Sequence, residues 1–209
     1  MPTVLSILAL VLAYLIGGFP SAFVFARLRK GVDIRQVGSH NMGAMNTFYS
    51  VGFWWGMLVL ILDMSKGAAA VAVAWQLTHT GYIQLIAGAV AVVGHGFPVY
   101  LKFKGGKGGA ACIGILAYVM PWGIPVYPAV FGLVLLATRF PTLSYSAAFL
   151  AFPVLAAFVY HSITYIIFSL GILLLPGIRY LPRIFEMRRG AGGSGWRHVF
   201  VRRSLKDRL

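Results

Sequence analysis

The sequence has few acidic residues and almost no cysteine. Only four of its 209 residues are aspartate or glutamate and only 11% are charged, whereas a soluble domain carries about 25% charged residues. Four acids cannot coat a soluble surface, so a free-standing soluble domain is excluded. Cys112 is the single cysteine, which excludes a disulfide framework within the chain. Long apolar runs and 14% aromatic residues exclude a disordered chain.

Hydrophobic residues and positive charge are abundant instead. The chain is 59% hydrophobic, has a mean hydropathy of +0.83 and carries a formal net charge of +14. A nucleic-acid-binding domain of this charge would keep its apolar residues in a compact core, but here apolar runs occupy most of the length. We therefore predict an integral membrane protein with a basic side and no nucleic-acid partner.

The apolar runs predict the transmembrane helices, because about 20 mostly apolar residues are needed to cross a bilayer. No basic residue precedes the first run, so it is read as a retained helix rather than a signal peptide. The fold class is an all-α polytopic membrane protein with about seven transmembrane helices, two of them short. Proline interrupts the run 109–138 and splits it in two. The predicted helices cover residues 3–26 (with a kink at 17–21), 51–77, 81–101, 109–120, 123–138, 145–160 and 162–177.

The basic residues predict the orientation of these helices. Every lysine and arginine except Lys66 falls within four segments: 27–35, 102–107, residue 139, and 179–208. If seven helices cross, all four segments lie on one face, and positive loops mark the cytoplasm. The N-terminus is then outside and the C-terminus cytoplasmic, in the cell inner (plasma) membrane. We predict one transmembrane domain over 1–189 and a basic tail over 190–209, which either contacts anionic headgroups or stays solvated.

Two polar, glycine-containing loops lie on the predicted inner face. The first, 37–46, contains Ser39, His40, Asn41 and Asn46 shortly before a helix, where side-chain caps and bare amides favour an anion. The second, 94–110, combines glycines with three lysines and runs into the next helix, so successive amides could form an anion nest. It lacks the Walker A spacing. A plain capped loop and a basic loop touching anionic lipid are the alternatives.

Three ionisable residues fall within or beside the apolar spans. Asp63 and Lys66 are three residues apart on one helix face, at membrane depth, where charges face a cavity or each other. They are either functional or a structural ion pair. His95 lies between glycines near the inner end of a helix, and either contacts substrate or is hydrogen-bonded within the protein.

No cluster in the sequence has metal-ligand spacing, and no pair of carboxylates suits general acid–base catalysis. The polar residues thus predict a phosphate-binding site beside an apolar cavity, without a dedicated protein base and without a metal or cofactor. An activated acyl or phosphoryl donor suits such a site, because positioning and charge stabilisation alone can accelerate its reaction.

At these residues, from about 8 to 189, the sequence resembles the bacterial integral-membrane glycerol-3-phosphate acyltransferases that use acyl-phosphate. The resemblance implies acyl transfer from a fatty acyl-phosphate to the 1-hydroxyl of glycerol 3-phosphate, giving lysophosphatidic acid for phospholipid biosynthesis. It also implies seven helices, contact with membrane lipids and no cofactor. The motifs that carry it are Gly38-Ser39-x-Asn41-x-Gly43-Ala44-x-Asn46, Asp63-x-x-Lys66-Gly67, Gly94-His95-x-Phe97-Pro98 and Phe103-Lys104-Gly105-Gly106-Lys107-Gly108.

The resemblance implies two groups of site residues. The catalytic candidates are Ser39, Lys104 and His95. The candidates for binding substrate and phosphate are Asn41, Gly43, Asn46, Lys66, Gly105, Gly106, Lys107, Gly108, Arg139, Ser144 and Arg183.

The chain departs from the family pattern at several motif positions. Tyr49 stands where the family has an arginine, Tyr180 where it has a histidine and Gly192 where it has a glutamate, while Arg183 replaces an asparagine. Tyrosine lacks the permanent charge and the bidentate hydrogen bonding of arginine. We hypothesise that Arg183 restores this phosphate-binding charge from another direction. Two further functions stay open: acylation of another small polar acceptor, and non-enzymatic carriage of an anionic lipid or phosphorylated solute.

Overall fold

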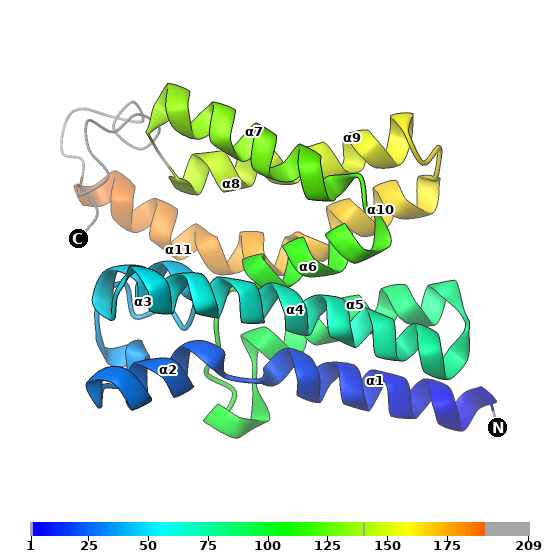
Figure 1. Cartoon of the computed structure of the whole chain (residues 1–209), viewed down its shortest axis with the longest axis horizontal. Coiled ribbons are helices and arrows are strands. Elements are labelled where there is room, and N and C mark those ends of the chain that lie inside the picture. The colour runs from blue at the N-terminus through cyan, green and yellow to red at the C-terminus, as the bar shows by residue number, and fades with distance from the viewer. Residues whose placement is uncertain (1, 140, 191–209) are drawn as a thin grey trace. The chain divides into compact units, whose positions relative to one another are not determined.

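The computed structural model describes residues 2–139 and 141–190 as helices joined by loops (Figure 1). The chain forms two compact units, Met1–Val119 and Met120–Leu209, which are taken in turn. The predicted division into a domain over 1–189 and a tail over 190–209 stays a prediction, because residues 191–209, Gly192 among them, lie outside the described residues.

The first unit contains six α-helices and two 3-10 turns. Its three longest elements are α1, α4 and α5, which pack against one another, and α6 packs on α4. The bounds are α1 Pro2–Gly18, α2 Ser21–Lys30, η1 Ile34–Gln36, α3 Ala44–Ser50, α4 Phe53–Thr78, α5 Gly81–Gly96, η2 Val99–Leu101 and α6 Gly109–Val119.

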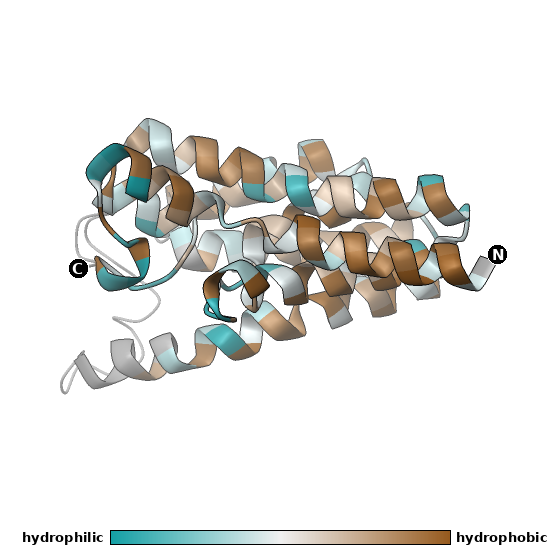
Figure 2. Cartoon of the chain, turned by 90° about the horizontal axis from the view of Figure 1, so that it is seen from below, coloured by the Kyte–Doolittle hydropathy of each residue, from teal (hydrophilic) through white to brown (hydrophobic). Residues whose placement is uncertain are grey.

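Small residues fill the interior of this unit, while large apolar residues face outward. Ala13, Ala70 and Ala91 are fully buried, whereas Val4 is 68% exposed and Trp54 is 78% exposed. This is the packing expected in a bilayer, where lipid solvates large side chains and small residues let helices approach closely. Figure 2 shows apolar colour along α1 and hydrophilic colour where α2 ends and the next loop begins.

The predicted kink at residues 17–21 is a complete break between α1 and α2. Pro20 precedes α2, and the helical hydrogen bonding resumes with Val24 N donating to Pro20 O at 3.0 Å. Gly17 packs directly on α5, because a methyl group there would overlap the backbone of Ala91. The sequence therefore predicts both the interruption and the close contact at this point.

The second unit contains α7 Gly123–Thr138, α8 Pro141–Phe149, α9 Ala151–Phe158, α10 Ile163–Ile172 and α11 Leu174–Gly190. Its core is aromatic: the Tyr127 ring lies 5.5 Å from that of Phe149 and 5.8 Å from that of Phe152, centroid to centroid. The Tyr160 hydroxyl accepts a hydrogen bond from the Trp122 backbone N–H at 3.1 Å. That bond ties the turn before α7 to the turn after α9.

The apolar elements follow the seven predicted runs. Among the described residues, four helical segments are long and apolar enough to cross a membrane: Thr3–Lys30, which joins α1 and α2, Phe53–Thr78, Gly81–Leu101, and Ile163–Pro182, which joins α10 and part of α11. Three shorter apolar helices, Gly109–Val119, Gly123–Thr138 and Leu143–Phe158, account for the other runs. The all-helical prediction is confirmed, while the number of crossings and their orientation stay predictions.

Several helix boundaries differ from those predicted. The predicted helix 145–160 is divided at Leu150 into α8 and α9, and 162–177 is divided at Leu173 into α10 and α11. The chain stays helical to Gly190, because the basic residues that end the apolar run are themselves good helix formers. The short helix α3 was not expected, since its seven residues lie in a polar segment without an apolar run.

Candidate functional site

The candidate site in the first unit is built from two loops. The Ser39 loop, residues 37–43, connects η1 to α3, and the glycine–lysine loop, residues 102–108, connects η2 to α6. Ser39 and Lys104 are exposed, while Asn41, Gly43 and Lys107 are partly buried. Gly106 of the second loop lies against the Met42 carbonyl of the first, so the structure brings two separate sequence motifs to one region.

Asn46 organises the Ser39 loop from within α3. Its side-chain amide nitrogen donates to the carbonyls of Ile34, Val37 and Asn41 at 2.9 to 3.0 Å. Its side-chain oxygen accepts from Ser39 N at 3.0 Å and from the Ser50 hydroxyl at 3.1 Å. Asn46 is 3% exposed, and all of its polar atoms bind protein.

The donors and the acceptor of this amide are occupied by protein atoms, so Asn46 shapes the loop that presents Ser39. Its predicted role in binding substrate stays a prediction. Neither helix after this loop has a side-chain cap, because Gly43 occupies the N-cap of α3 and Gly52 that of α4.

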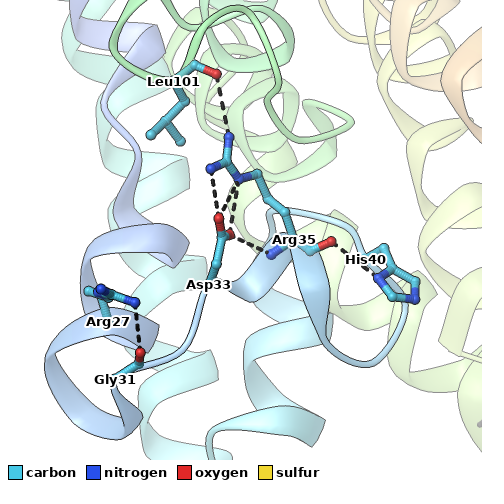
Figure 3. A network of polar contacts seen from close by, with 6 residues as sticks. All are labelled: Arg27, Gly31, Asp33, Arg35, His40 and Leu101. Carbon is cyan, nitrogen blue, oxygen red and sulfur yellow. Dashed lines mark hydrogen bonds and ion pairs between the residues drawn. The ribbon is translucent and has the colours of Figure 1, made fainter.

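Arg35 joins η1 to η2, the two 3-10 turns that precede the loops, and the sequence analysis missed it. Its guanidinium pairs with Asp33, with Nη2 to Oδ2 at 2.7 Å, and its Nη1 donates to Leu101 O at 3.4 Å (Figure 3). The carbonyl of Arg35 lies 3.1 Å from His40 Nδ1. The sequence did contain a signal for this pair. Asp33 lies two residues before Arg35, a spacing that suits a local bidentate ion pair.

The Asp33–Arg35 pair also sets the local electrostatics. The Arg35 guanidinium, mainly through its hydrogen bonds, lowers the pKa of the Asp33 carboxyl. The Arg35 carbon Cζ lies 5.2 Å from the centroid of the Phe23 ring, a cation–π contact with α2. The carboxylate is therefore ionised, and the guanidinium is held against both α2 and η2.

The glycine–lysine loop folds back on the end of α5. Gly105 N donates to Gly96 O and Gly106 N donates to His95 O, each at 3.1 Å. A methyl group at Gly106 would overlap both the His95 ring at Nε2 and the Met42 carbonyl of the Ser39 loop. Glycine is thus required where the two loops meet. The loop backbone thus approaches other protein atoms closely at this point.

The end of this loop leads into α6. Gly108 has φ +93°, a conformation that favours glycine, and its carbonyl accepts the first helical hydrogen bond from Cys112 N at 3.0 Å. The helix begins at Gly109, and its first N–H groups have no partner within the helix. The predicted arrangement of lysines beside a helix N-terminus is therefore present in the fold, with Lys104 exposed.

Asp63 and Lys66 form the buried ion pair. Lys66 Nζ lies 2.7 Å from Asp63 Oδ1 and donates to Phe19 O at 2.9 Å, and Lys66 is 7% exposed. Two of the three N–H donors of the Lys66 ammonium are thus directed at a carboxylate and a carbonyl, and its role as a phosphate ligand stays a prediction. His95, 3% exposed, lies beneath the glycine–lysine loop with Nδ1 4.0 Å from Asp63 Oδ1.

A groove of about 470 Å³ adjoins this ion pair. Residues of α1 and α4, Phe19 and Tyr100 line it, and most of them are apolar. The sequence analysis expected an apolar cavity next to the polar loops, and this groove is the candidate for it.

Three predicted site residues belong to the second unit. Arg139 is exposed at the C-terminal cap of α7, and Ser144 is fully buried in α8. Arg183 is a residue of α11, and its side chain lies outside the described part of the structure. Tyr180, at a motif position, packs on Tyr145 with ring centroids 6.4 Å apart. A joint site of these residues with the two loops stays a prediction.

Comparison with known proteins identifies the family. The family model described as glycerol-3-phosphate acyltransferase matches residues 7–190. The chain belongs to the glycerol-3-phosphate acyltransferase family. It is thus an acyltransferase, and the membrane character inferred from its apolar runs agrees with this assignment.

Individual relatives agree with the family model. The chain is 49% identical over 206 residues to glycerol-3-phosphate acyltransferase 2 of Dehalococcoides mccartyi strain ATCC BAA-2266 / KCTC 15142 / 195, covering 99% of this chain and 98% of the relative. It is 43% identical over 137 residues to the glycerol-3-phosphate acyltransferase of Bacillus subtilis strain 168, covering 66% and 70%.

A solved structure has the same fold. The glycerol 3-phosphate form of PlsY (YgiH), an integral membrane glycerol 3-phosphate acyltransferase, superposes with a TM-score of 0.80 at 29% identity. The match covers 88% of this chain and 92% of PlsY. The lysophosphatidic acid form of the same enzyme gives a TM-score of 0.78.

Proposed function

We propose that this membrane acyltransferase transfers a fatty acyl group from acyl-phosphate to the 1-hydroxyl of glycerol 3-phosphate, producing lysophosphatidic acid for phospholipid biosynthesis. The observation that carries the proposal is the family match over residues 7–190, which includes both loops of the site. The relatives named for glycerol 3-phosphate support the acceptor. The donor is proposed from the resemblance of the motifs and from the chemistry of the loops.

The loops suit two phosphorylated substrates. Lys104 is exposed on the glycine–lysine loop, Lys107 follows it, and the N-terminus of α6 lies directly beyond. Together they form a cationic region for a phosphate group, with backbone N–H groups at the helix end. We propose Ser39, on the facing loop, as the group that orients the acceptor, with Asn41 and Gly43 beside it.

The proposed reaction needs no protein base. The acceptor hydroxyl oxygen attacks the carbonyl carbon of the acyl-phosphate, and the bond from that carbon to the bridging phosphate oxygen breaks. The hydroxyl proton passes to the departing phosphate, which leaves as inorganic phosphate, so atoms and charge balance. Lys104 stabilises the negative charge that develops, and positioning of the two substrates supplies much of the remaining acceleration.

The groove lined by α1 and α4 supports a fatty donor, because an acyl chain needs an apolar path beside the polar site. We further propose that both loops face the cytoplasm in the inner membrane, as their positive charge indicates. We propose Arg139, Ser144 and Arg183 of the second unit as further substrate-binding residues, as the resemblance of the motifs implies.

One assay tests the function. Purified protein in detergent is mixed with palmitoyl-phosphate and glycerol 3-phosphate, and lysophosphatidic acid and free phosphate are followed. We expect both products in equal amounts, and we expect Lys104→Ala to lower kcat/KM about 100-fold, as loss of one transition-state charge contact does. Arg29→Ala, which removes an exposed charge on α2, is the matched control and should retain activity.

The other outcomes distinguish the alternatives. Phosphate release coupled to acylation of a different polyol would show that this polyol, and not glycerol 3-phosphate, is the acceptor. Tyr49 at the family's arginine position is the sequence feature that motivates this comparison. No consumption of donor with any acceptor would favour a carrier of anionic lipid and would contradict the proposal.

A further inference from the structure

The buried ion pair of α4 has no part in the proposed chemistry. Asp63 is 1% exposed and Lys66 is 7% exposed, in a helix apolar enough to span the membrane. Each charge costs about 2.5–3.5 kcal/mol on insertion scales at the centre of a bilayer, and a buried pair is often no more stabilising than apolar residues of similar volume. Stability alone therefore does not explain why the pair is present.

On one side, the pair holds the break between α1 and α2. The Ser21 hydroxyl donates to Asp63 Oδ1 at 2.5 Å, and Lys66 Nζ donates to Phe19 O at 2.9 Å. Pro20 stands between these two partners, and its ring removes one backbone donor from the junction. Two charged side chains of α4 thus hold the point at which the first helix stops and restarts.

On the other side, the same carboxylate faces the end of α5. Asp63 Oδ1, which accepts from Ser21, lies 4.0 Å from His95 Nδ1. The opposite edge of that ring, at Nε2, lies against the backbone of Gly106, whose N–H donates to the His95 carbonyl at 3.1 Å. His95 therefore lies between the carboxylate in the membrane span and the glycine–lysine loop at its surface.

We propose that Asp63 and Lys66 are positioning residues for the glycine–lysine loop. The pair fixes the end of α1 and the His95 ring relative to α4, and the ring supports Gly106, where the two loops of the site meet. A loop that is not held in this way should bind the phosphate group of the donor less well. Only this part of the inference rests on the proposed function. In this role the two residues act through the loop and not on the reacting atoms.

The test removes both charges together. Asp63→Asn/Lys66→Met leaves no uncompensated buried charge, so the fold should survive. Hydrogen exchange of the segment 97–108 is measured without substrate, with thermal unfolding in detergent as the measure of stability. We expect exchange at Gly105 and Gly106 at least tenfold faster than in the unchanged chain, with the midpoint of unfolding little changed.

Activity supplies the second measurement. A loosened phosphate loop should raise KM for acyl-phosphate about tenfold, with kcat lowered much less, whereas general destabilisation would reduce the amount of active protein without moving KM. Gln84→Leu is the matched control: it removes a side-chain contact between α5 and α4, to Val71 O at 3.4 Å, near the other end of both helices. It should leave the loop's exchange and KM unchanged.

Each result decides the proposal. Wild-type exchange at Gly105 and Gly106 in the double variant would overturn it, as would an equal increase in Gln84→Leu. If the double variant fails to fold, Ser21→Ala, which removes one hydrogen bond to Asp63, must still speed exchange in the loop by about threefold. An unchanged chain that makes no lysophosphatidic acid would refute the proposed function, while the exchange measurement would still decide this inference.

Discussion

At the scale of single residues, side chains that look like ligands in the sequence are used to build the loops. Asn46 and Lys66 are polar residues in motifs, yet their polar atoms bind the protein itself. Ser39 and Lys104 are exposed. Spacing along the chain reveals where polar residues concentrate, but it does not reveal which of them are buried, because burial depends on how distant segments meet.

Asn46 gives the first prediction at this scale. Asn46→Asp keeps an acceptor for Ser39 N and for the Ser50 hydroxyl, but it places negative oxygen against three carbonyls that now receive N–H donors. A buried polar group left unsatisfied costs about 1–3 kcal/mol. We expect a lower midpoint of thermal unfolding in detergent and a loss of acyl transfer of at least tenfold.

The control for this prediction is Ser50→Ala, which removes only one hydrogen bond to the Asn46 oxygen. It should change the unfolding midpoint by a small amount and retain most of the activity. Unaltered stability and turnover in Asn46→Asp would show that the amide donors do not hold the Ser39 loop.

At the scale of elements, the sequence predicts the helices better than their ends. The proline-containing stretch before residue 123 correctly separates α6 from α7, because proline cannot supply the next helical N–H. The divisions at Leu150 and Leu173 carry a similar signal that the sequence analysis missed. Pro153 and Pro176 follow three residues later, and each lacks the N–H that would continue the preceding helix. The hydrogen bond from Arg35 to Leu101 was missed for a different reason, because 66 residues separate these two residues along the chain.

The contact between the glycine–lysine loop and the Ser39 loop gives a prediction at this scale. A methyl group at Gly106 meets the His95 ring and the Met42 carbonyl, so Gly106→Ala must push the loops apart. A displacement of about 1 Å at a site can cost 100-fold in rate. We expect kcat/KM of Gly106→Ala to fall by about that factor.

Gly109→Ala is the matched comparison, because a methyl group there meets nothing within 4 Å and alanine favours helix. Its activity should equal that of the unchanged chain. Equal activity losses in both variants, measured by lysophosphatidic acid formation, would indicate a general effect of added volume and would argue against a tight junction at Gly106.

At the scale of the whole molecule, composition establishes the class of protein and the charge pattern predicts its orientation. Buried alanines and exposed leucines and tryptophans reverse the arrangement of a soluble protein, which agrees with the scarcity of acids. The resemblance of the motifs predicts Arg139 and Ser144 as site residues, but sequence position alone does not predict their packing, because burial such as that of Ser144 depends on contacts between distant segments.

The orientation itself is the last prediction. In the first unit, α2 lies at one end and the turn between α4 and α5 lies at the other, beside the N-terminus (Figure 1). Arg29 and Gly81 are exposed at these two ends. In a Cys112→Ser background, right-side-out spheroplasts carrying Gly81→Cys should react with an impermeant maleimide, and those carrying Arg29→Cys should react only after permeabilisation. We expect this pattern because positively charged loops stay on the cytoplasmic side. The reverse pattern would place the phosphate-binding loops outside and would contradict a cytoplasmic active site.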